Sequence, residues 1–224
     1  MLRVEGLQVG TVEELASGSG AAFRTGIRKG PVRRRVRLTT LGLEGDEQAD
    51  RHHHGGPDKA VLCSALSHYA AWRTELGRPE MGPGGFGENL SLPMTEEDVA
   101  IGDRLRVGTA VCEVSQPRIP CWKQAARWDV PDLVLRMRRS GRTGWYLRVL
   151  EEGYVWPFAP LEVLARPYGG WTVARLNELL RSGSGEAEVR GIAECPVLAV
   201  AFRRELLRTP APMRPHGGPP EGAD

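Results

Sequence analysis

One cysteine stands in a setting that favours chemistry over packing. Cys121 lies in the segment Gln116-Pro117-Arg118-Ile119-Pro120-Cys121-Trp122-Lys123, directly after a predicted strand. Two prolines stiffen the chain before the cysteine, and Arg118 and Lys123 flank it. Nearby cations favour a thiolate, and the thiolate is both the nucleophile and the metal ligand. Cys121 is therefore a candidate for either role.

The other three cysteines fit a structural role. Cys63, Cys112 and Cys195 lie in apolar strand or helix patterns, where most free cysteines are buried. The four cysteines have no CxxC spacing, and the N-terminus shows neither an apolar signal core nor a small-residue cleavage site. We therefore expect reduced thiols and a cytoplasmic location.

A polar stretch from Gly42 to Val61 is dense in glycine, aspartate and histidine and precedes a predicted strand. Such loops often carry sites, although a polar turn without any ligand would have the same composition. Three adjacent histidines, His52 to His54, also suggest zinc. In an extended chain neighbouring side chains point to opposite faces, so only His52 and His54 could share a metal. No convincing further ligand lies nearby, and a zinc site is disfavoured.

Two further stretches could contact a ligand. Gly84-Gly85-Phe86-Gly87-Glu88-Asn89-Leu90 lets the backbone approach a ligand closely and could aim several N–H groups at an anion, although a plain tight turn explains it equally well. The densest basic run is Arg28, Lys29 and the arginines 33 to 35. This run could meet a phosphate, or it could be the solvated face of a strand.

Many short strands joined by turns predict a β-barrel or closed sandwich. Strands are expected at Val32–Leu38 and Ala60–Cys63, and hairpins at 105–114 and 145–156. One helix is expected after Ser67 and another after Pro131. Near the C-terminus three more are expected, after the cap Thr172, over Glu186–Glu194, and from Pro196 to about Arg208.

Composition excludes some function classes. The net charge is +2 over 224 residues, and the arginines 33 to 35 lack the interleaved aromatic residues that base stacking needs. We therefore expect no nucleic-acid partner. No apolar run approaches the roughly 18 residues needed to span a bilayer, so no membrane partner is expected.

Three motifs, taken together and in this order, resemble a known family. GLEGDEQADRHHHGGPDKAV, GFGENLS and IGDRLRVGTAVCEVSQPRIPCWK, with the trailing helices, are similar to the YiiM-type MOSC proteins. MOSC denotes the C-terminal domain of molybdenum cofactor sulfurase. The resemblance covers roughly Val9 to Arg208 and implies a fold that is mostly β with α. The implied domains are a MOSC β-barrel with flanking helices over 1–167, a three-helix module over 168–209 and a flexible tail over 210–224.

The resemblance also implies a cofactor, molybdenum bound to a pterin dithiolene (molybdopterin), with Cys121 as the protein ligand to the metal. The implied reaction is the reduction of N-hydroxylated small molecules, such as N-hydroxylated purine bases, with electrons from a separate reductase. His52 precedes the pair that matches the family, so only the pair is carried over. We assign the catalytic roles to Cys121, His53 and His54. We assign cofactor binding to Lys29, Arg51, His53, Gly87, Asn89, Arg118 and Cys121.

A different class of function fits the same cysteine. A thiolate could hold a persulfide and deliver sulfur to another protein, so that Cys121 would act as a nucleophile without any metal. The oligomeric state stays open at this stage.

Overall fold

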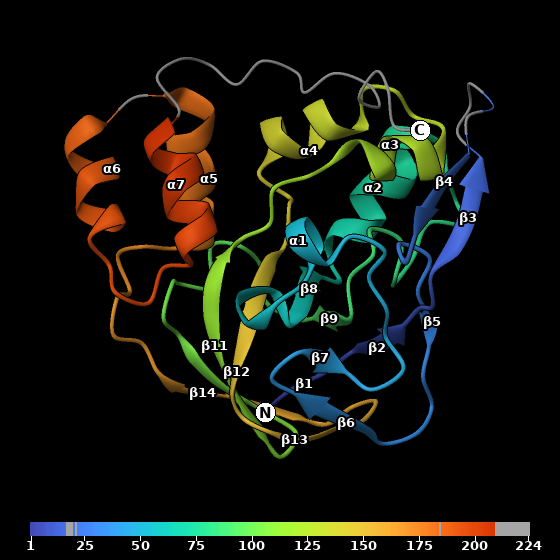
Figure 1. The fold of residues 1–224 in the computed structure, drawn as a ribbon, viewed down its shortest axis with the longest axis horizontal. Coiled ribbons are helices and arrows are strands. Elements are labelled where there is room, and N and C mark those ends of the chain that lie inside the picture. Colours follow the sequence, from blue (N-terminus) through green and yellow to red (C-terminus); the bar gives the residue numbers. More distant parts are fainter. Residues whose placement is uncertain (17–19, 21, 184, 209–224) are drawn as a thin grey trace.

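The computed structural model describes residues 1–16, 20, 22–183 and 185–208, with only the backbone of Arg51 and His52. The predicted tail, 210–224, lies outside the described residues. The largest sheet of the described chain is a curled nine-stranded sheet in the order β1-β14-β10-β11-β12-β8-β9-β2-β5 (Figure 1). Its neighbours are antiparallel except for β8 and β9, which are parallel. A three-stranded sheet, β13-β6-β7, and a β3–β4 hairpin complete the β structure. The fold is thus mostly β with α, as predicted.

The strands are short, as the frequent turn residues predict. They are β1 Leu2–Arg3, β2 Gly6–Val9, β3 Glu13–Ala16, β4 Ala22–Thr25, β5 Gly30–Pro31, β6 Val36–Thr39, β7 Gly42–Leu43, β8 Val61–Ala65, β9 Leu90–Leu92, β10 Arg104–Val107, β11 Ala110–Pro117, β12 Trp145–Glu151, β13 Gly153–Val155 and β14 Pro160–Ala165.

One predicted hairpin is confirmed and the other is wrong. Strands β10 and β11 pair around a turn at Gly108-Thr109, where Gly108 has φ +63°. Strands β12 and β13 also exist, but β13 pairs with β6 and not with β12. Only one residue separates β12 from β13, so the chain passes directly from the large sheet into the small one. The strand expected at Val32–Leu38 begins only at Val36.

The helices are α1 Arg51–His54, α2 His68–Leu76, α3 Trp122–Trp128, α4 Leu133–Ser140, α5 Val173–Ser182, α6 Glu186–Ala193 and α7 Val200–Arg208, with a 3-10 turn η1 at Pro57–Lys59. The helices expected after Ser67 and Pro131 are α2 and α4. Thr172 caps α5 as predicted, because its side chain accepts the N–H of Arg175. The last helix begins at Val200, four residues later than expected, and α3 was not predicted. No helix of the described chain is long and apolar enough to cross a membrane.

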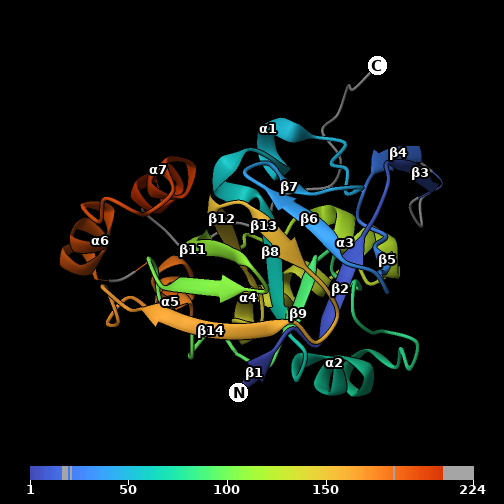
Figure 2. The ribbon, with the colours of Figure 1, turned by 90° about the horizontal axis from the view of Figure 1, so that it is seen from below.

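Helices α5 to α7 stand together at one end of the large sheet (Figure 2). Their apolar side chains belong to the same hydrophobic cluster as the sheet, because Leu176, Ile192 and Phe202 are buried in one core with Leu105 and Val114. The division of the chain at 167/168 stays a prediction. The core itself continues across that position.

This shared core predicts the effect of removing one ring. Phe202 is 1% exposed, and Phe202→Ala should lower the free energy of unfolding by about 3–5 kcal/mol through lost burial and a new cavity. Leu207→Ala on the same helix, at a side chain 57% exposed, should change it by less than about 0.5 kcal/mol. Denaturant unfolding should show one lowered transition for Phe202→Ala. A separate early transition with the main one unchanged would contradict the shared core.

Candidate active site

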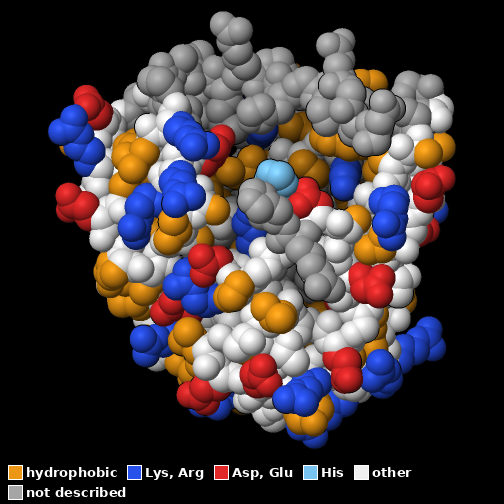
Figure 3. Space-filling view, viewed as in Figure 1, with side chains coloured by type: hydrophobic (Ala, Val, Ile, Leu, Met, Phe, Trp, Pro, Cys, Tyr) orange, Lys and Arg blue, Asp and Glu red, His pale blue; other side chains and the backbone are white. Residues whose placement is uncertain are grey.

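A cavity opens between the loops at one end of the curled sheet. About 600 Å³ between its lining atoms is free of protein, part of it open to solvent. Figure 3 shows a hollowed region of this face with a histidine among charged and hydrophobic side chains. Of the predicted site residues, six line the cavity: Lys29, His54, Gly87, Asn89, Arg118 and Cys121.

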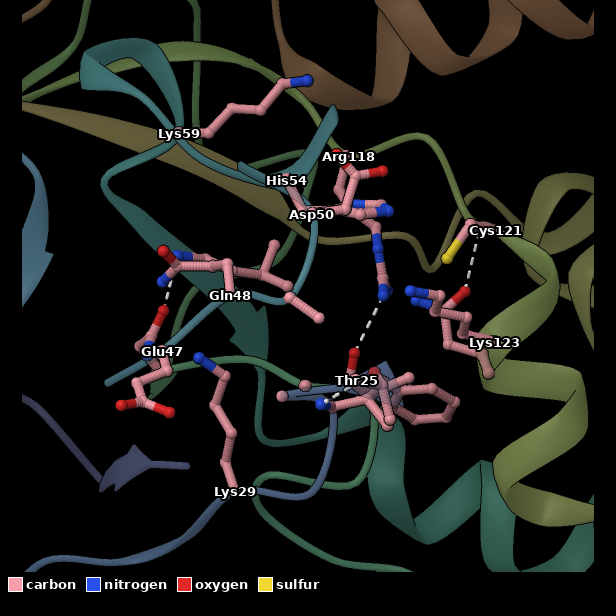
Figure 4. A pocket seen from close by; sticks show the side chains of 18 of the residues that line it. Thr25, Lys29, Glu47, Gln48, Asp50, His54, Lys59, Arg118, Cys121 and Lys123 are labelled. Atoms are coloured by element: carbon pink, nitrogen blue, oxygen red, sulfur yellow. Dashed lines mark hydrogen bonds between the residues drawn. The ribbon is translucent and has the colours of Figure 1, made fainter. Parts of the chain in front are cut away.

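Cys121 is held at the junction between strand β11 and helix α3. The strand ends at Pro117, and Cys121 is extended (φ −117°, ψ 165°) and caps the helix N-terminus. The backbone N–H of Cys121 donates to Oε1 of Gln124 at 2.9 Å, which fixes the residue at this point. In Figure 4 its sulfur lies on the same side of the cavity as the guanidinium of Arg118.

Exposure separates Cys121 from the other cysteines. Cys121 is half-buried, whereas Cys63 and Cys112 are 0% exposed and Cys195 is 5% exposed. Burial raises the pKa of Cys112 to about 12 and that of Cys63 well above its usual value. Those two thiols therefore stay protonated and inert. Cys121 is the cysteine that opens onto the cavity.

Arg118 is a buried cation with no acidic partner among the described residues. Its residue is 6% exposed, and its guanidinium donates to the carbonyl oxygens of Phe86 at 2.8 Å and Thr143 at 3.4 Å. Within the described part of the chain, no carboxylate forms an ion pair with it. A buried charge is stabilised by pairing with an opposite charge. Arg118 therefore makes the cavity suited to an anionic ligand.

Lys29 also lines the cavity, but its ammonium is already paired. Its side chain is 6% exposed and donates to both carboxylate oxygens of Asp46, at 2.6 Å to Oδ1. Asp46 further accepts the N–H of Gly10 and the amide of Gln48. Burial lowers the pKa of Lys29, and Asp46 counteracts this effect. Lys29 was predicted to contact the phosphate or the pterin of the cofactor, and the sequence did not reveal this buried ion pair with Asp46.

Two more lysines and two carboxylates line the cavity. Lys59 donates to the carbonyl of His53 at 2.6 Å, and Lys123 donates to the carbonyl of Arg24 at 3.1 Å. Burial lowers the pKa of Lys59. The carboxylates are those of Glu47 and Asp50.

The two histidines of the predicted pair, His53 and His54, lie in different places. His54 lines the cavity, and burial lowers its pKa to about 4, with Arg118 as the next cause. The His53 side chain is 70% exposed, and its Nδ1 lies 2.8 Å from Asp50 Oδ2. His53 is not among the residues lining the cavity. The side chain of Arg51, also predicted to bind the cofactor, lies outside the described residues.

The glycine loop before β9 satisfies its own backbone. Gly84 and Phe86 donate their N–H groups to the carboxylate of Glu88, at 2.7 and 3.1 Å. These two N–H groups, which the sequence left open as donors to an anionic ligand, are thus taken up by a side chain of the loop itself. Gly84 has φ +84°, and a Cβ there would lie 2.4 Å from the Lys29 carbonyl oxygen. A side chain at this position would therefore clash with the neighbouring backbone.

Gly87 and Asn89 complete this wall. Gly87 has φ +82°, and a Cβ would lie 3.1 Å from the side chain of Ile27. The Asn89 side chain accepts the N–H of Leu62 at 3.1 Å and donates to the Gln8 carbonyl at 3.3 Å. Asn89 therefore joins β8 to β2, and its amide is committed to backbone.

The arginines 33 to 35 are exposed and do not line the cavity, which agrees with the interpretation of this basic run as the solvated face of a strand.

The described residues contain no group of three or more His, Cys, Asp or Glu side chains that could hold a metal ion. A metal at Cys121 would need its remaining ligands from a cofactor.

Sequence reasoning missed Tyr146, Asp46 and Glu88 as parts of the site. Tyr146 lies on β12 in an apolar stretch that predicts core, and its side chain lines the cavity. Asp46 and Glu88 stood inside the recognised motifs, but spacing alone does not show which partner a carboxylate takes.

The lowered pKa of His54 predicts a dependence of stability on pH. Because His54 has a pKa of about 4 in the folded protein and 6.5 as the ordinary value, the unfolded chain binds more protons between these two pH values. The free energy of unfolding should fall as the pH is lowered through this window, and His54→Gln should reduce the fall. Urea unfolding at several pH values measures both proteins. Parallel curves would contradict the burial of a neutral imidazole.

Comparison with known proteins agrees with this architecture. The MOSC domain model matches residues 50–160. The uncharacterized protein YflK of Bacillus subtilis (strain 168) is 47% identical over 161 residues, 71% of this chain and 72% of that protein. Protein YiiM of Escherichia coli (strain K12) is 44% identical over 134 residues, 58% of this chain and 59% of that protein.

A more distant relative and a solved structure extend the match. A protein of Gibberella moniliformis (strain M3125 / FGSC 7600) named "Reductase" is 38% identical over 183 residues, which are 78% of this chain and 32% of that protein. The crystal structure of YiiM from Geobacillus stearothermophilus matches with a TM-score of 0.79 at 31% identity, covering 94% of this chain and 100% of that one. The chain belongs to the MOSC domain family, as a YiiM-type member.

Proposed function

We propose that this protein reduces N-hydroxylated compounds, such as N-hydroxylated purine bases, with a molybdenum cofactor held at Cys121. The observation that carries the proposal is a single cavity-facing thiol beside a buried guanidinium that no carboxylate of the described chain neutralises. Membership of a family associated with the molybdenum cofactor supports the choice of cofactor. The relative named "Reductase" supports the direction of the reaction.

The cavity fits such a cofactor by its chemistry. Thiolate sulfur suits soft metal centres, and Cys121 supplies one such ligand. The cofactor's phosphate and pterin need cations and hydrogen-bond donors, for which Arg118 and Lys123 are available on the cavity wall. We assign Lys29 a supporting role, because Asp46 already neutralises it.

The reaction sets requirements that the chain must meet. Converting an N–OH group to N–H and water consumes two electrons and two protons. When bound, the cofactor would supply the two-electron chemistry, and the protein would orient the substrate and exclude competing reactions. The electrons must come from a partner, which we propose is a separate reductase. This chain matches only 32% of the Gibberella relative, so the rest of that polypeptide is long enough to include an electron-donating reductase domain.

His54 contributes as a neutral imidazole. With a pKa of about 4, it is uncharged near neutral pH and can accept or donate a hydrogen bond to the substrate. It therefore carries no extra proton to donate near neutral pH, and its role in proton transfer is to pass on a proton taken from another group. His53 is exposed, lies 2.8 Å from Asp50 and does not line the cavity, and its assignment to catalysis stays a prediction. The four free cysteines support a reducing compartment, and we propose the cytoplasm.

Cys121→Ser tests the centre of the proposal. A hydroxyl is a poor ligand for a soft metal, so this variant should lose most bound molybdenum and all turnover while unfolding at the temperature of the cofactor-free unsubstituted protein. Metal analysis, the reductase assay and thermal unfolding measure the three properties. Cys112→Ser, at a buried strand position, should instead cost about 1–3 kcal/mol of stability and keep the metal.

The same measurements separate the second candidate function. Stoichiometric molybdenum and pterin in purified protein would support the reductase. Labile sulfane sulfur on Cys121 without the metal would instead indicate a sulfur carrier.

Arg118→Ala and Lys29→Ala should fail in different ways. Removing the unpaired guanidinium should weaken cofactor retention by roughly 10–100-fold. Removing Lys29 leaves the Asp46 carboxylate buried without its cation, and should cost about 3–5 kcal/mol of stability. Lys29→Met/Asp46→Asn, which removes both charges, should recover much of that loss. Equal cofactor content in Arg118→Ala and the unsubstituted protein would return Arg118 to a purely structural role.

A further inference from the structure

Tyr146 has a fixed position beside Cys121. It lies on β12, between β8 and β11, where it pairs with Leu62 and Gln116. Its carbonyl accepts the hydroxyl of Ser115 at 3.1 Å. The residue is 7% exposed, and its side chain lines the cavity together with Cys121 and Arg118. The sheet therefore fixes the backbone from which this ring extends into the cavity lining.

The hydroxyl of Tyr146 has no hydrogen-bond partner among the described residues. Tyrosine hydroxyls in a protein interior normally have one, whereas the Tyr146 oxygen is not fully buried and solvent in the cavity can bond to it. Tyr69, the other buried tyrosine, shows the usual pattern: its hydroxyl donates to Glu88 and accepts the N–H of Gly85 at 3.1 Å. Because Tyr146 lines the cavity and no protein group of the described chain takes up its hydroxyl, this donor is available to a bound ligand.

Arg118 and Cys121 both lie near enough to the Tyr146 hydroxyl to affect its pKa. Burial raises the pKa of Tyr146 to about 12, Arg118 lowers it and Cys121 raises it. Both groups therefore act on the hydroxyl electrostatically. A phenol carries a proton at neutral pH even at its ordinary pKa, so this side chain has an O–H to donate.

Gln124 adds a second donor next to Cys121. Its Oε1 accepts the N–H of Cys121, and this bond fixes which end of the amide carries the nitrogen. The Nε2 group is then left buried with no acceptor in the described chain. Gln124 also lines the cavity. Together with Arg118, the groups around Cys121 are rich in donors.

We propose that Tyr146 is a substrate-specificity residue, whose hydroxyl donates a hydrogen bond to the oxygen of the substrate's N–O group beside Cys121. This inference rests on the proposed function. The oxygen-bearing substrate offers an acceptor at this point, and the product amine has lost it. A site that hydrogen-bonds a substrate oxygen discriminates against the analogue without it, because the site's own polar group is then left unpaired.

Equilibrium binding to the cofactor-loaded protein tests this role without turnover. With no electron donor present, the dissociation constants of 6-N-hydroxylaminopurine and of adenine are measured by titration calorimetry for the unsubstituted protein and Tyr146→Phe. Tyr146→Phe should bind the N-hydroxylated base about 10-fold more weakly and adenine within about 2-fold of the unsubstituted protein, as expected for one lost hydrogen bond. Tyr154→Phe, at an exposed tyrosine on β13, is the matched control and should change neither constant.

The remaining outcomes each decide against the inference. Equal weakening of both ligands, or no change in either, would overturn the specificity role, as would loss of molybdenum from Tyr146→Phe. If the unsubstituted, cofactor-loaded protein neither binds nor reduces the N-hydroxylated base, the proposed function fails, and this inference fails with it. If that protein reduces the base and Tyr146→Phe binds it equally well, only the inference fails.

Discussion

The cavity depends on one buried carboxylate, that of Glu88. The residue is 0% exposed, and a charge at such a position is very costly unless hydrogen bonds satisfy it. Here the donors converge on it: the backbone N–H groups of Gly84 and Phe86 and the hydroxyls of Tyr69 and Ser91. These bonds wrap the glycine loop around the carboxylate and so determine the direction in which its carbonyl groups point.

Those carbonyl groups in turn hold two arginines. The Phe86 carbonyl accepts from Arg118, and the Gly84 carbonyl accepts from Arg127 at 2.7 Å. Neutral carbonyls can orient a guanidinium without cancelling its charge. Arg118 therefore stays cationic and rigid at the cavity, whereas Lys29, bonded to a carboxylate, loses most of its attraction for an anion. The difference between the two cations lies in their acceptors.

Local signals in the sequence predicted the local parts of this structure. The spacing of Val173, Leu176 and Leu180 behind Thr172 gave the correct helix, and a glycine turn gave the β10–β11 hairpin. Cys121 was separable from the other cysteines because prolines and cations surround it. The resemblance to a family added the order of the motifs and the fold class, which the comparisons confirm.

Features that depend on distant residues had no such signal. Strand β13 pairs with β6, more than a hundred residues earlier, and the pattern around Gly153 suggests a hairpin with its immediate neighbour instead. In the sequence Lys29 belongs to a basic run that predicts exposure. Only the folded structure places Asp46 against it. Tyr146 reads as core because its strand is apolar, and only the packed structure shows that its hydroxyl faces a cavity.

The charges around His54 connect anion binding with proton binding. Burial lowers its pKa most and Arg118 lowers it next, Asp50 raises it, and Lys123 and Lys59 lower it by smaller amounts. An anion bound against these cations would offset their effect and raise the pKa of the imidazole. Linkage is reciprocal, so a protonated His54 would bind that anion more tightly by the same factor. Because no carboxylate of the described residues pairs with Arg118, an anion bound beside it would change the charge of the neighbouring histidine.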